Sequence, residues 1–181
     1  DINLVIIDGT MGLGNQKLLP AGPLREPLEQ GFEKADAFVL IGDDQHNIAD
    51  TLPADTPTFT AQYTTDPTVI PDKNTNFAAF TGIGFPQKFF DHLKKMDVDL
   101  IETFAFADHH LYSAADITRL LNFARTNNAK LLTTEKDWIK LQSFEQHLAE
   151  INTTCIPVPV TLKWDDPDSI KDFLQSKLSS A

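Results

Sequence analysis

Short apolar runs alternate with amphipathic segments along most of this 181-residue chain. Residues 4–7 and 37–41 are runs of β-branched and other apolar side chains, which are typical of buried strands. Between them, Leu24, Leu28 and Phe32 recur every fourth residue, as on the buried face of a helix. The two runs and the helix predict a β-α-β unit, whose strands are parallel.

The alternation resumes after residues 47–76, which hold four prolines and one alternating segment, residues 58–63. We interpret this stretch as a linker with one edge strand, because proline in sheets is confined to edges and turns. Beyond it, the same patterns predict strands over residues 77–80, 100–106, 130–132 and 155–160, and helices from residue 86 and over residues 114–126, 135–141 and 169–178. This order predicts an α/β fold with a largely parallel sheet.

Two of the predicted helices begin with the spacing of a capping box. Ser113 precedes Asp116 by three residues, and Thr134 precedes Asp137 by the same interval. In this motif the hydroxyl accepts a hydrogen bond from the amide three residues on, and the carboxylate accepts one from the capping residue's amide. The spacing therefore predicts that helices start at these two places.

The net charge and the cysteine count exclude several classes of protein. With 15 Lys and Arg against 26 Asp and Glu, the net charge is −11, which excludes the basic footprint of a nucleic-acid-binding protein. The one cysteine, Cys155, excludes an internal disulfide and a multi-cysteine zinc site. No apolar run approaches the roughly 18 residues of a membrane span. Because Asp1 leads directly into an apolar run, we expect these residues to be part of a longer chain.

The most distinctive polar cluster is Asp108-His109-His110, which lies between the predicted strand 100–106 and the helix that follows Ser113. Open α/β sheets bind ligands at the carboxyl ends of their strands. An imidazole there titrates near neutral pH, so it is suited to hold a general base or to pass on a proton. The alternative is that these are two loop histidines and a turn aspartate.

Other polar segments have both a functional and a structural interpretation. Arg25 and Glu26 lie where a helix begins, so Arg25 is placed to bind a phosphate, or the pair forms a surface ion pair. Residues 133–137 lie at a strand-to-helix junction, where free amides favour an anion, although capping explains most of this segment. Asp43 and Asp44 offer Mg²⁺ ligands, but acidic pairs are common in so acidic a chain. No complete phosphate-binding loop, G-x-x-x-x-G-K-[ST], is present.

Several of these segments occur together in an order that matches a known family. They are residues 5–9, 12–15, 18–27, 80–86, 107–113 and 133–137, of which residues 18–27 read Leu-Leu-Pro-Ala-Gly-Pro-Leu-Arg-Glu-Pro. On these motifs the chain resembles the tetraacyldisaccharide 4′-kinase family. The resemblance implies a kinase of lipid A biosynthesis in Gram-negative bacteria, which moves the γ-phosphate of ATP, with Mg²⁺, to the 4′-hydroxyl of a tetraacyl disaccharide 1-phosphate. It implies action at the cytoplasmic face of the inner membrane.

The resemblance also implies an organisation into two three-layer α/β/α domains with the active site between them. Members of the family begin with a membrane-associating segment and a phosphate-binding loop, neither of which lies in residues 1–181. We therefore expect residues 1–55 to end the P-loop-type nucleotide-binding domain, residues 56–76 to be a linker and residues 77–181 to form the second α/β domain. Because the loop is absent, we expect these residues alone to be catalytically inactive.

Position by position, the resemblance assigns roles to a few residues. His109 matches the active-site histidine of the family, which pairs with an aspartate base outside these residues, and Asp108 lies beside it. Arg25 and Glu26 match residues beside the nucleotide. A signature for substrate binding or structure is matched by Thr134, Glu135, Lys136 and Asp137, and no metal ligand is assigned. The alternatives are a non-catalytic nucleotide- or sugar-binding α/β module and a purely structural domain.

Overall fold

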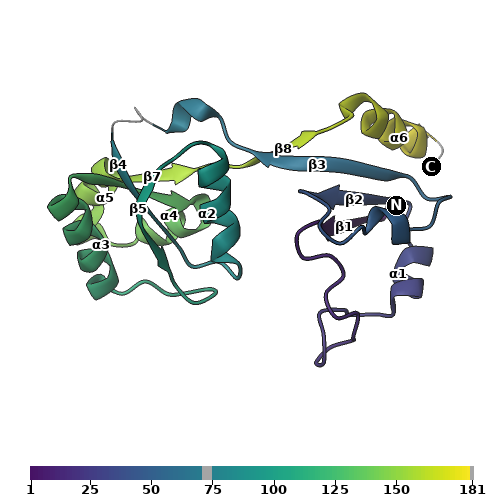
Figure 1. Cartoon of the computed structure of the whole chain (residues 1–181), viewed down its shortest axis with the longest axis horizontal. Coiled ribbons are helices and arrows are strands. Elements are labelled where there is room, and N and C mark those ends of the chain that lie inside the picture. Colours follow the sequence, from purple (N-terminus) through teal and green to yellow (C-terminus); the bar gives the residue numbers. More distant parts are fainter. Residues whose placement is uncertain (71–74, 180–181) are drawn as a thin grey trace. The chain divides into compact units, whose positions relative to one another are not determined.

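The computed structural model describes residues 1–70 and 75–179, which form two compact units (Figure 1). The first unit contains Asp1–Thr64 and the chain from Val160 onward, and the second contains Thr65–Pro159. Each unit has its own four-stranded sheet with helices packed against it. The predicted α/β class, with largely parallel strands, is confirmed.

The sheet of the first unit has the strand order β1-β2-β3-β8. The strands are β1 (Leu4–Asp8), β2 (Ala37–Ile41), β3 (Thr58–Thr64) and β8 (Thr161–Trp164). The first three are parallel to one another, and β8 runs antiparallel to β3. Helix α1 (Leu28–Glu33) connects β1 to β2, so the predicted β-α-β unit is present, although its helix is shorter than the sequence pattern.

All five residues of β2 are buried, because this strand is covered on both faces. On one face, Phe38 and Leu40 pack with Ile48 and Leu52. On the other face, Ala37 and Phe59 pack against Ile170 of helix α6 (Pro167–Ser179). The ring of Phe173 on the same helix lies 5.3 Å from that of Phe59. The last helix of the chain is therefore part of the first unit.

These contacts differ from the expected boundaries in two respects. Residues 56–76 are not simply a linker with an edge strand, because β3 lies between β2 and β8 within the first sheet. The chain beyond Pro159 belongs to the first unit and not to the second, since β8 pairs with β3. The strand expected over residues 155–160 is β7, which ends at Val158, and residues 71–74 of the expected linker lie outside the described residues.

The sheet of the second unit has the order β5-β4-β6-β7, and all its strands are parallel. The strands are β4 (Asn76–Thr81), β5 (Leu100–Ala105), β6 (Ala129–Thr134) and β7 (Cys155–Val158). The helices are α2 (Pro86–Lys95), α3 (Ala114–Asn127), α4 (Glu135–Leu141) and α5 (Leu148–Thr154), and a 3₁₀ turn (Glu145–His147) lies between α4 and α5. Helix α5 is missing from the sequence-based prediction, whereas the predicted bounds of α4 agree with the structure.

Alternate residues of β4 face opposite sides of this sheet, as the two-residue period of a strand requires. Ala78 and Phe80 pack against residues of α3, α4 and α5, including Ile117, Leu141 and Ile151. Phe77 and Ala79 pack on the other side, against Phe89, Phe90 and Leu93 of α2. The second unit is thus a three-layer α/β/α domain whose central strand is buried on both faces.

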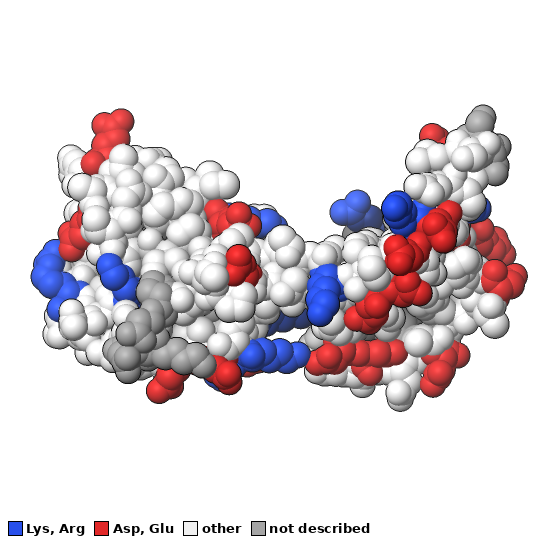
Figure 2. All heavy atoms as spheres, turned by 90° about the horizontal axis from the view of Figure 1, so that it is seen from above, with Lys and Arg blue, Asp and Glu red and all other residues white. Residues whose placement is uncertain are grey.

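Acidic side chains gather on the first unit, as the visible face in Figure 2 shows on the right. An excess of negative charge disfavours the binding of polyanions such as nucleic acids, and the net charge of the chain is −11. Within the described residues, no helix is long and apolar enough to cross a membrane.

The thiol of Cys155 is expected to be inert in the folded protein. Burial raises the pKa of this thiol to about 12, and the nearby Glu150 carboxylate acts in the same direction. Since the thiolate is the reactive form, an aromatic disulfide reagent at pH 8 should label Cys155 only after denaturant is added. Rapid labelling of the folded protein, followed by absorbance, would show that β7 opens readily.

Candidate functional site

The second sheet has a topological switch at β4. The chain leaves β4 for α2 on one face of the sheet, whereas it leaves β5 and β6 for α3 and α4 on the other face. Diverging connections of this kind open a crevice at the carboxyl ends of the strands, where open α/β sheets bind ligands. The segments that follow β4, β5 and β6 are the ones that carry the sequence motifs.

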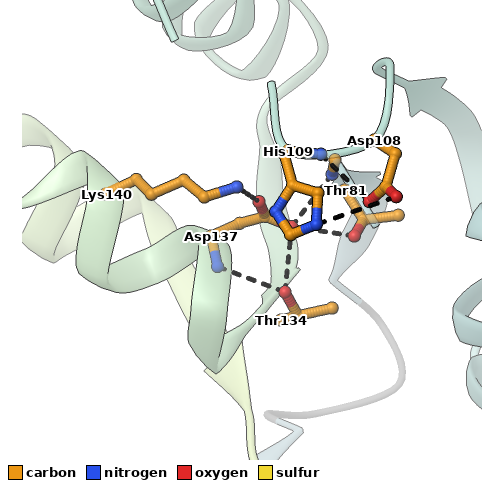
Figure 3. A network of polar contacts seen from close by, with 7 residues as sticks. Thr81, Asp108, His109, Thr134, Asp137 and Lys140 are labelled. Atoms are coloured by element: carbon orange, nitrogen blue, oxygen red, sulfur yellow. Dashed lines mark hydrogen bonds and ion pairs between the residues drawn. The ribbon is translucent and has the colours of Figure 1, made fainter. Parts of the chain in front are cut away.

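Asp137 lies at this edge of the sheet, in the first turn of α4, and its side chain is fully buried. Its Oδ2 accepts hydrogen bonds from Thr81 Oγ1 at 2.8 Å, from the Gly82 amide at 2.9 Å and from Thr134 Oγ1 at 2.9 Å. Its Oδ1 lies 3.0 Å from Lys140 Nζ (Figure 3). The carboxylate therefore joins the end of β4 to the start of α4.

These contacts decide the charge state of Asp137. Burial raises the pKa of its carboxyl, but the hydrogen bonds from Gly82, Thr81, Lys140 and Thr134 outweigh burial and lower the pKa overall. Thr134 Oγ1 accepts from the Asp137 amide at 3.2 Å, as the capping spacing predicts. The carboxylate, however, turns toward β4, so this helix start is tied to a neighbouring strand.

The loop after β5 carries Asp108 and His109. The His109 amide donates to the Gly82 carbonyl at 3.2 Å and to Asp108 Oδ1 at 3.0 Å. The backbone of His109 is left-handed, with φ of 56°, and its side chain is 94% exposed. Its Nε2 lies 3.9 Å from Asp108 Oδ2. The structure thus presents an imidazole outward at the carboxyl edge of the sheet, on a backbone that is held in place.

The neighbouring histidine has a different environment. The His110 ring stacks on Phe106 with centroids 4.8 Å apart, and it meets the edge of Tyr112 at 5.2 Å. Its Nε2 lies 3.1 Å from Asp116 Oδ2. The Asp116 carboxylate also completes the predicted capping box with Ser113, and these bonds lower its pKa to about 2. His110 is therefore a packed, hydrogen-bonded residue, whereas His109 is free to meet a ligand.

Two glycines let these loops approach one another. A Cβ added at Gly82 would lie 3.2 Å from His110 Cβ and 3.4 Å from the Ala107 carbonyl. A Cβ at Gly84 would lie 3.2 Å from Asp108 Oδ2. The Gly82-x-Gly84 pair, which matches no phosphate-binding pattern, thus makes room for the loop that carries His109.

The backbone of His109 gives a direct prediction for stability. A left-handed conformation is strained for alanine and easy for glycine, so His109→Gly should be about 1 kcal/mol more stable than His109→Ala. Denaturant unfolding of the two variants measures this difference. Thr118, on the exposed face of α3, provides the matched control, because there alanine should be more stable than glycine by a similar amount. Equal stability of the two variants at position 109 would contradict the left-handed assignment.

Arg25 and Glu26 belong to the first unit and precede α1. Arg25 is exposed, and the Glu26 carboxylate forms an ion pair with Lys34. The structure thus pairs Glu26 with the end of α1 and not with its sequence neighbour. The preceding loop is tied by the Asn15 side chain, whose Nδ2 donates to the Ala21 carbonyl at 2.8 Å.

A comparison with known families agrees with these motifs. The sequence model described as tetraacyldisaccharide-1-P 4′-kinase matches residues 1–179. The chain belongs to the tetraacyldisaccharide 4′-kinase family. The resemblance inferred from the sequence motifs is thereby confirmed.

Individual relatives show the extent of the similarity. The tetraacyldisaccharide 4′-kinase of Gluconobacter oxydans is 37% identical over 181 residues, which cover 100% of this chain and 54% of the relative. That of Paramagnetospirillum magneticum is 39% identical over 168 residues, covering 92% and 50%. The crystal structure of LpxK from Aquifex aeolicus in complex with ATP is 26% identical, with a TM-score of 0.64, covering 97% of this chain and 52% of that one. The chain therefore spans about half the length of the curated 4′-kinases it matches.

Asp44, one member of the acidic pair considered as a magnesium site, is held by local structure. Asp44 accepts hydrogen bonds from the amides of His46, Ile48 and Ala49, which lower its pKa and hold the turn after β2. Over residues 1–70 and 75–179, no group of three or more His, Cys, Asp or Glu side chains is arranged to hold a metal ion. These residues do not fit a complete Mg²⁺ site.

Part of the site was not predicted from the sequence. Glu135 and Lys136 of the Thr-Glu-Lys-Asp signature are exposed, whereas Asp137 is buried. The sequence feature that could have indicated the contact of Asp137 with β4 is the Thr81-Gly82 pair at the end of that strand, which supplies a hydroxyl and an amide side by side. Lys140 was also missed, and its spacing of three residues from Asp137 is that of a helical ion pair.

Proposed function

We propose that the protein to which this chain belongs transfers the γ-phosphate of ATP to the 4′-hydroxyl of a tetraacyldisaccharide 1-phosphate, a reaction of lipid A biosynthesis. The observation that carries the proposal is the family match over residues 1–179. It is supported by the outward-facing imidazole of His109 at the switch point of the second sheet, where a ligand is expected.

Within this proposal, His109 is the residue nearest to the chemistry. Phosphoryl transfer needs an acceptor hydroxyl that loses its proton and a phosphate whose charge is neutralised. An exposed imidazole is suited to orient the carboxylate base that takes this proton, and Asp108 places a carboxylate beside the ring. His109 would act through its Nε2 or Nδ1 without forming a covalent bond to the substrate.

Arg25 and Glu26 are proposed to contact the nucleotide. The exposed Arg25 guanidinium offers paired N–H donors for phosphate oxygens. Glu26 is oriented by Lys34. Mg²⁺ would neutralise phosphate charge when bound; the described residues hold no group of three or more metal-ligating side chains, and no step of the proposed mechanism at these residues depends on it.

The acceptor also suggests where the protein works. A disaccharide that carries four acyl chains stays in a membrane, so the kinase must meet it at a membrane surface. We therefore propose action at the cytoplasmic face of the inner membrane of a Gram-negative bacterium, where ATP is available. The chemistry of the substrate and the family match support this placement.

Release of ADP that depends on the acceptor tests the proposed function. The intact protein, with ATP and Mg²⁺, should produce ADP in a coupled assay only when the tetraacyldisaccharide 1-phosphate is added in detergent micelles. A disaccharide without acyl chains serves as the control acceptor. ATP or sugar binding by calorimetry, with no ADP released in the presence of the lipid, would favour a non-catalytic binding module.

A further inference from the structure

We propose that Asp137 is a positioning residue that holds the loop bearing His109 in place, acting through Thr81 and Gly82 at the end of β4. Because it concerns how the kinase holds its active histidine, this role rests on the function proposed above. Asp137 itself does not meet the substrate, since its side chain is fully buried.

The first step is the attachment of Asp137 to β4. A buried carboxylate without hydrogen-bond partners is strongly unfavourable, so the contacts of Asp137 are required by its burial. Two of them come from consecutive residues of another element, the Thr81 hydroxyl at 2.8 Å and the Gly82 amide at 2.9 Å. These residues lie 56 and 55 positions away in the sequence. Asp137 therefore fixes the point at which the chain leaves β4.

The second step leads from β4 to the His109 loop. The same two residues that donate to Asp137 accept hydrogen bonds from this loop through their carbonyls. The Thr81 carbonyl accepts from the Phe106 amide at 2.9 Å, and the Gly82 carbonyl accepts from the His109 amide at 3.2 Å. The close approach of Gly82 to the Cβ of His110 brings the loop directly against this point. The carboxylate and the imidazole loop are thus both attached to one short segment, Thr81-Gly82.

The third step is that His109 depends on this support. Its ring is 94% exposed, so packing contributes little to its direction. Its backbone adopts a left-handed φ of 56°, which an L residue keeps only when neighbouring contacts hold it. If the end of β4 shifts, the imidazole is expected to turn away while the core of the second unit stays folded.

The charge of Asp137 argues against a direct catalytic role. Lys140 Nζ lies 3.0 Å from its Oδ1, and the same ammonium group lies 5.7 Å from the centre of the Tyr112 ring. The carboxylate is therefore paired with an ammonium group that also lies over an aromatic ring. A general base must reach the acceptor hydroxyl, which a carboxylate in this position does not do.

Kinetics of the intact protein test this role. Asp137→Asn keeps the shape of the side chain but places an amide donor among groups that already donate. It should lower kcat at least tenfold with the KM for ATP within about twofold. In the double variant, Asp137→Asn should cause almost no loss of kcat beyond that of His109→Ala, because both substitutions remove the same contribution. Ser113→Ala, which removes a helix cap, is the folding control and should lower the melting temperature without changing kcat.

Hydrogen–deuterium exchange of the same proteins provides a readout that does not depend on activity. Asp137→Asn should accelerate exchange in peptides covering residues 80–84 and 106–110, with no change over residues 148–158. Unchanged exchange in the first two segments, or losses of kcat that multiply in the double variant, would overturn the positioning role. If the wild-type protein transfers no phosphate, the proposed function fails, and exchange alone decides whether Asp137 holds the loop.

Discussion

Purified residues 1–181 are expected to release no ADP from ATP, even with Mg²⁺ and saturating nucleotide. Phosphoryl transfer relies on a phosphate-binding loop and its lysine to position the γ-phosphate, and the sequence contains no G-x-x-x-x-G-K-[ST] motif. The described residues also lack a cluster of metal ligands that would neutralise the phosphate charge. A coupled assay for ADP, with a mock purification as the blank, measures this directly.

The intact protein is the positive control for that experiment, since it should consume ATP when the lipid acceptor is present. Binding of ATP to residues 1–181 should be weak, because it would depend on Arg25 and Glu26. Turnover above the blank, or sub-micromolar ATP affinity by calorimetry, would mean that these residues contain a phosphate site that neither the motifs nor the described structure reveals.

In the intact kinase, His109→Ala should lower kcat by about 100-fold or more while the KM for ATP changes little. This is the range expected when a group that assists proton transfer is removed. Folding should be almost unaffected, because the side chain is 94% exposed. Steady-state kinetics and a melting curve of the variant separate these two effects.

His110→Ala is the informative comparison, although it is not a neutral one. The ring packs on Phe106 and Tyr112 and contacts Asp116, so its removal should lower stability by about 1 kcal/mol or more. Its effect on kcat should be much smaller than that of His109→Ala. His147→Ala, in the 3₁₀ turn before α5, serves as the matched substitution away from the strand ends. Equal losses of kcat at positions 109 and 110 would remove the basis for assigning His109.

Much of the second unit was predictable because its signals are local. Strand β4 is buried on both faces, so Phe77 and Ala79 on one side and Ala78 and Phe80 on the other are all apolar. Such a strand is recognised in the sequence as a continuous apolar run. The start of α3 was predictable from Ser113, whose capping box needs contacts only within four residues. Such short-range patterns can be recognised in the sequence because the interacting residues are neighbours in the chain.

The return of the last residues to the first unit was not predictable on the same grounds. Thr161 pairs with Thr64 across 97 positions, and the side chains of Val160 and Leu162 are 45% and 40% exposed. Residues 160–164 alternate apolar with polar side chains, but the segment is short and its apolar residues merge with those of β7 in the sequence. Only the pairing partner distinguishes it, and a single sequence does not name that partner.

Some features of the candidate site could likewise be predicted from the sequence, and others could not. The position of His109 at the end of a strand follows from local pattern, but the opposite environments of His109 and His110 depend on how their loop folds, which includes the hydrogen bond from the His109 amide to the distant Gly82 carbonyl. The spacing of Thr134 and Asp137 predicts a cap. The hydrogen bonds that the Asp137 carboxylate accepts from Thr81 and Gly82 form only when two distant segments meet at the edge of the sheet.

The position of the phosphate in the product tests the central claim most directly. After incubation of the intact protein with ATP, Mg²⁺ and the tetraacyldisaccharide 1-phosphate, the lipid is extracted and analysed by phosphorus and proton NMR. The account predicts one new phosphate monoester, coupled to the proton on the 4′ carbon of the sugar, in addition to the original 1-phosphate. Recovery of unmodified lipid, or a new phosphate at any other position, would contradict it.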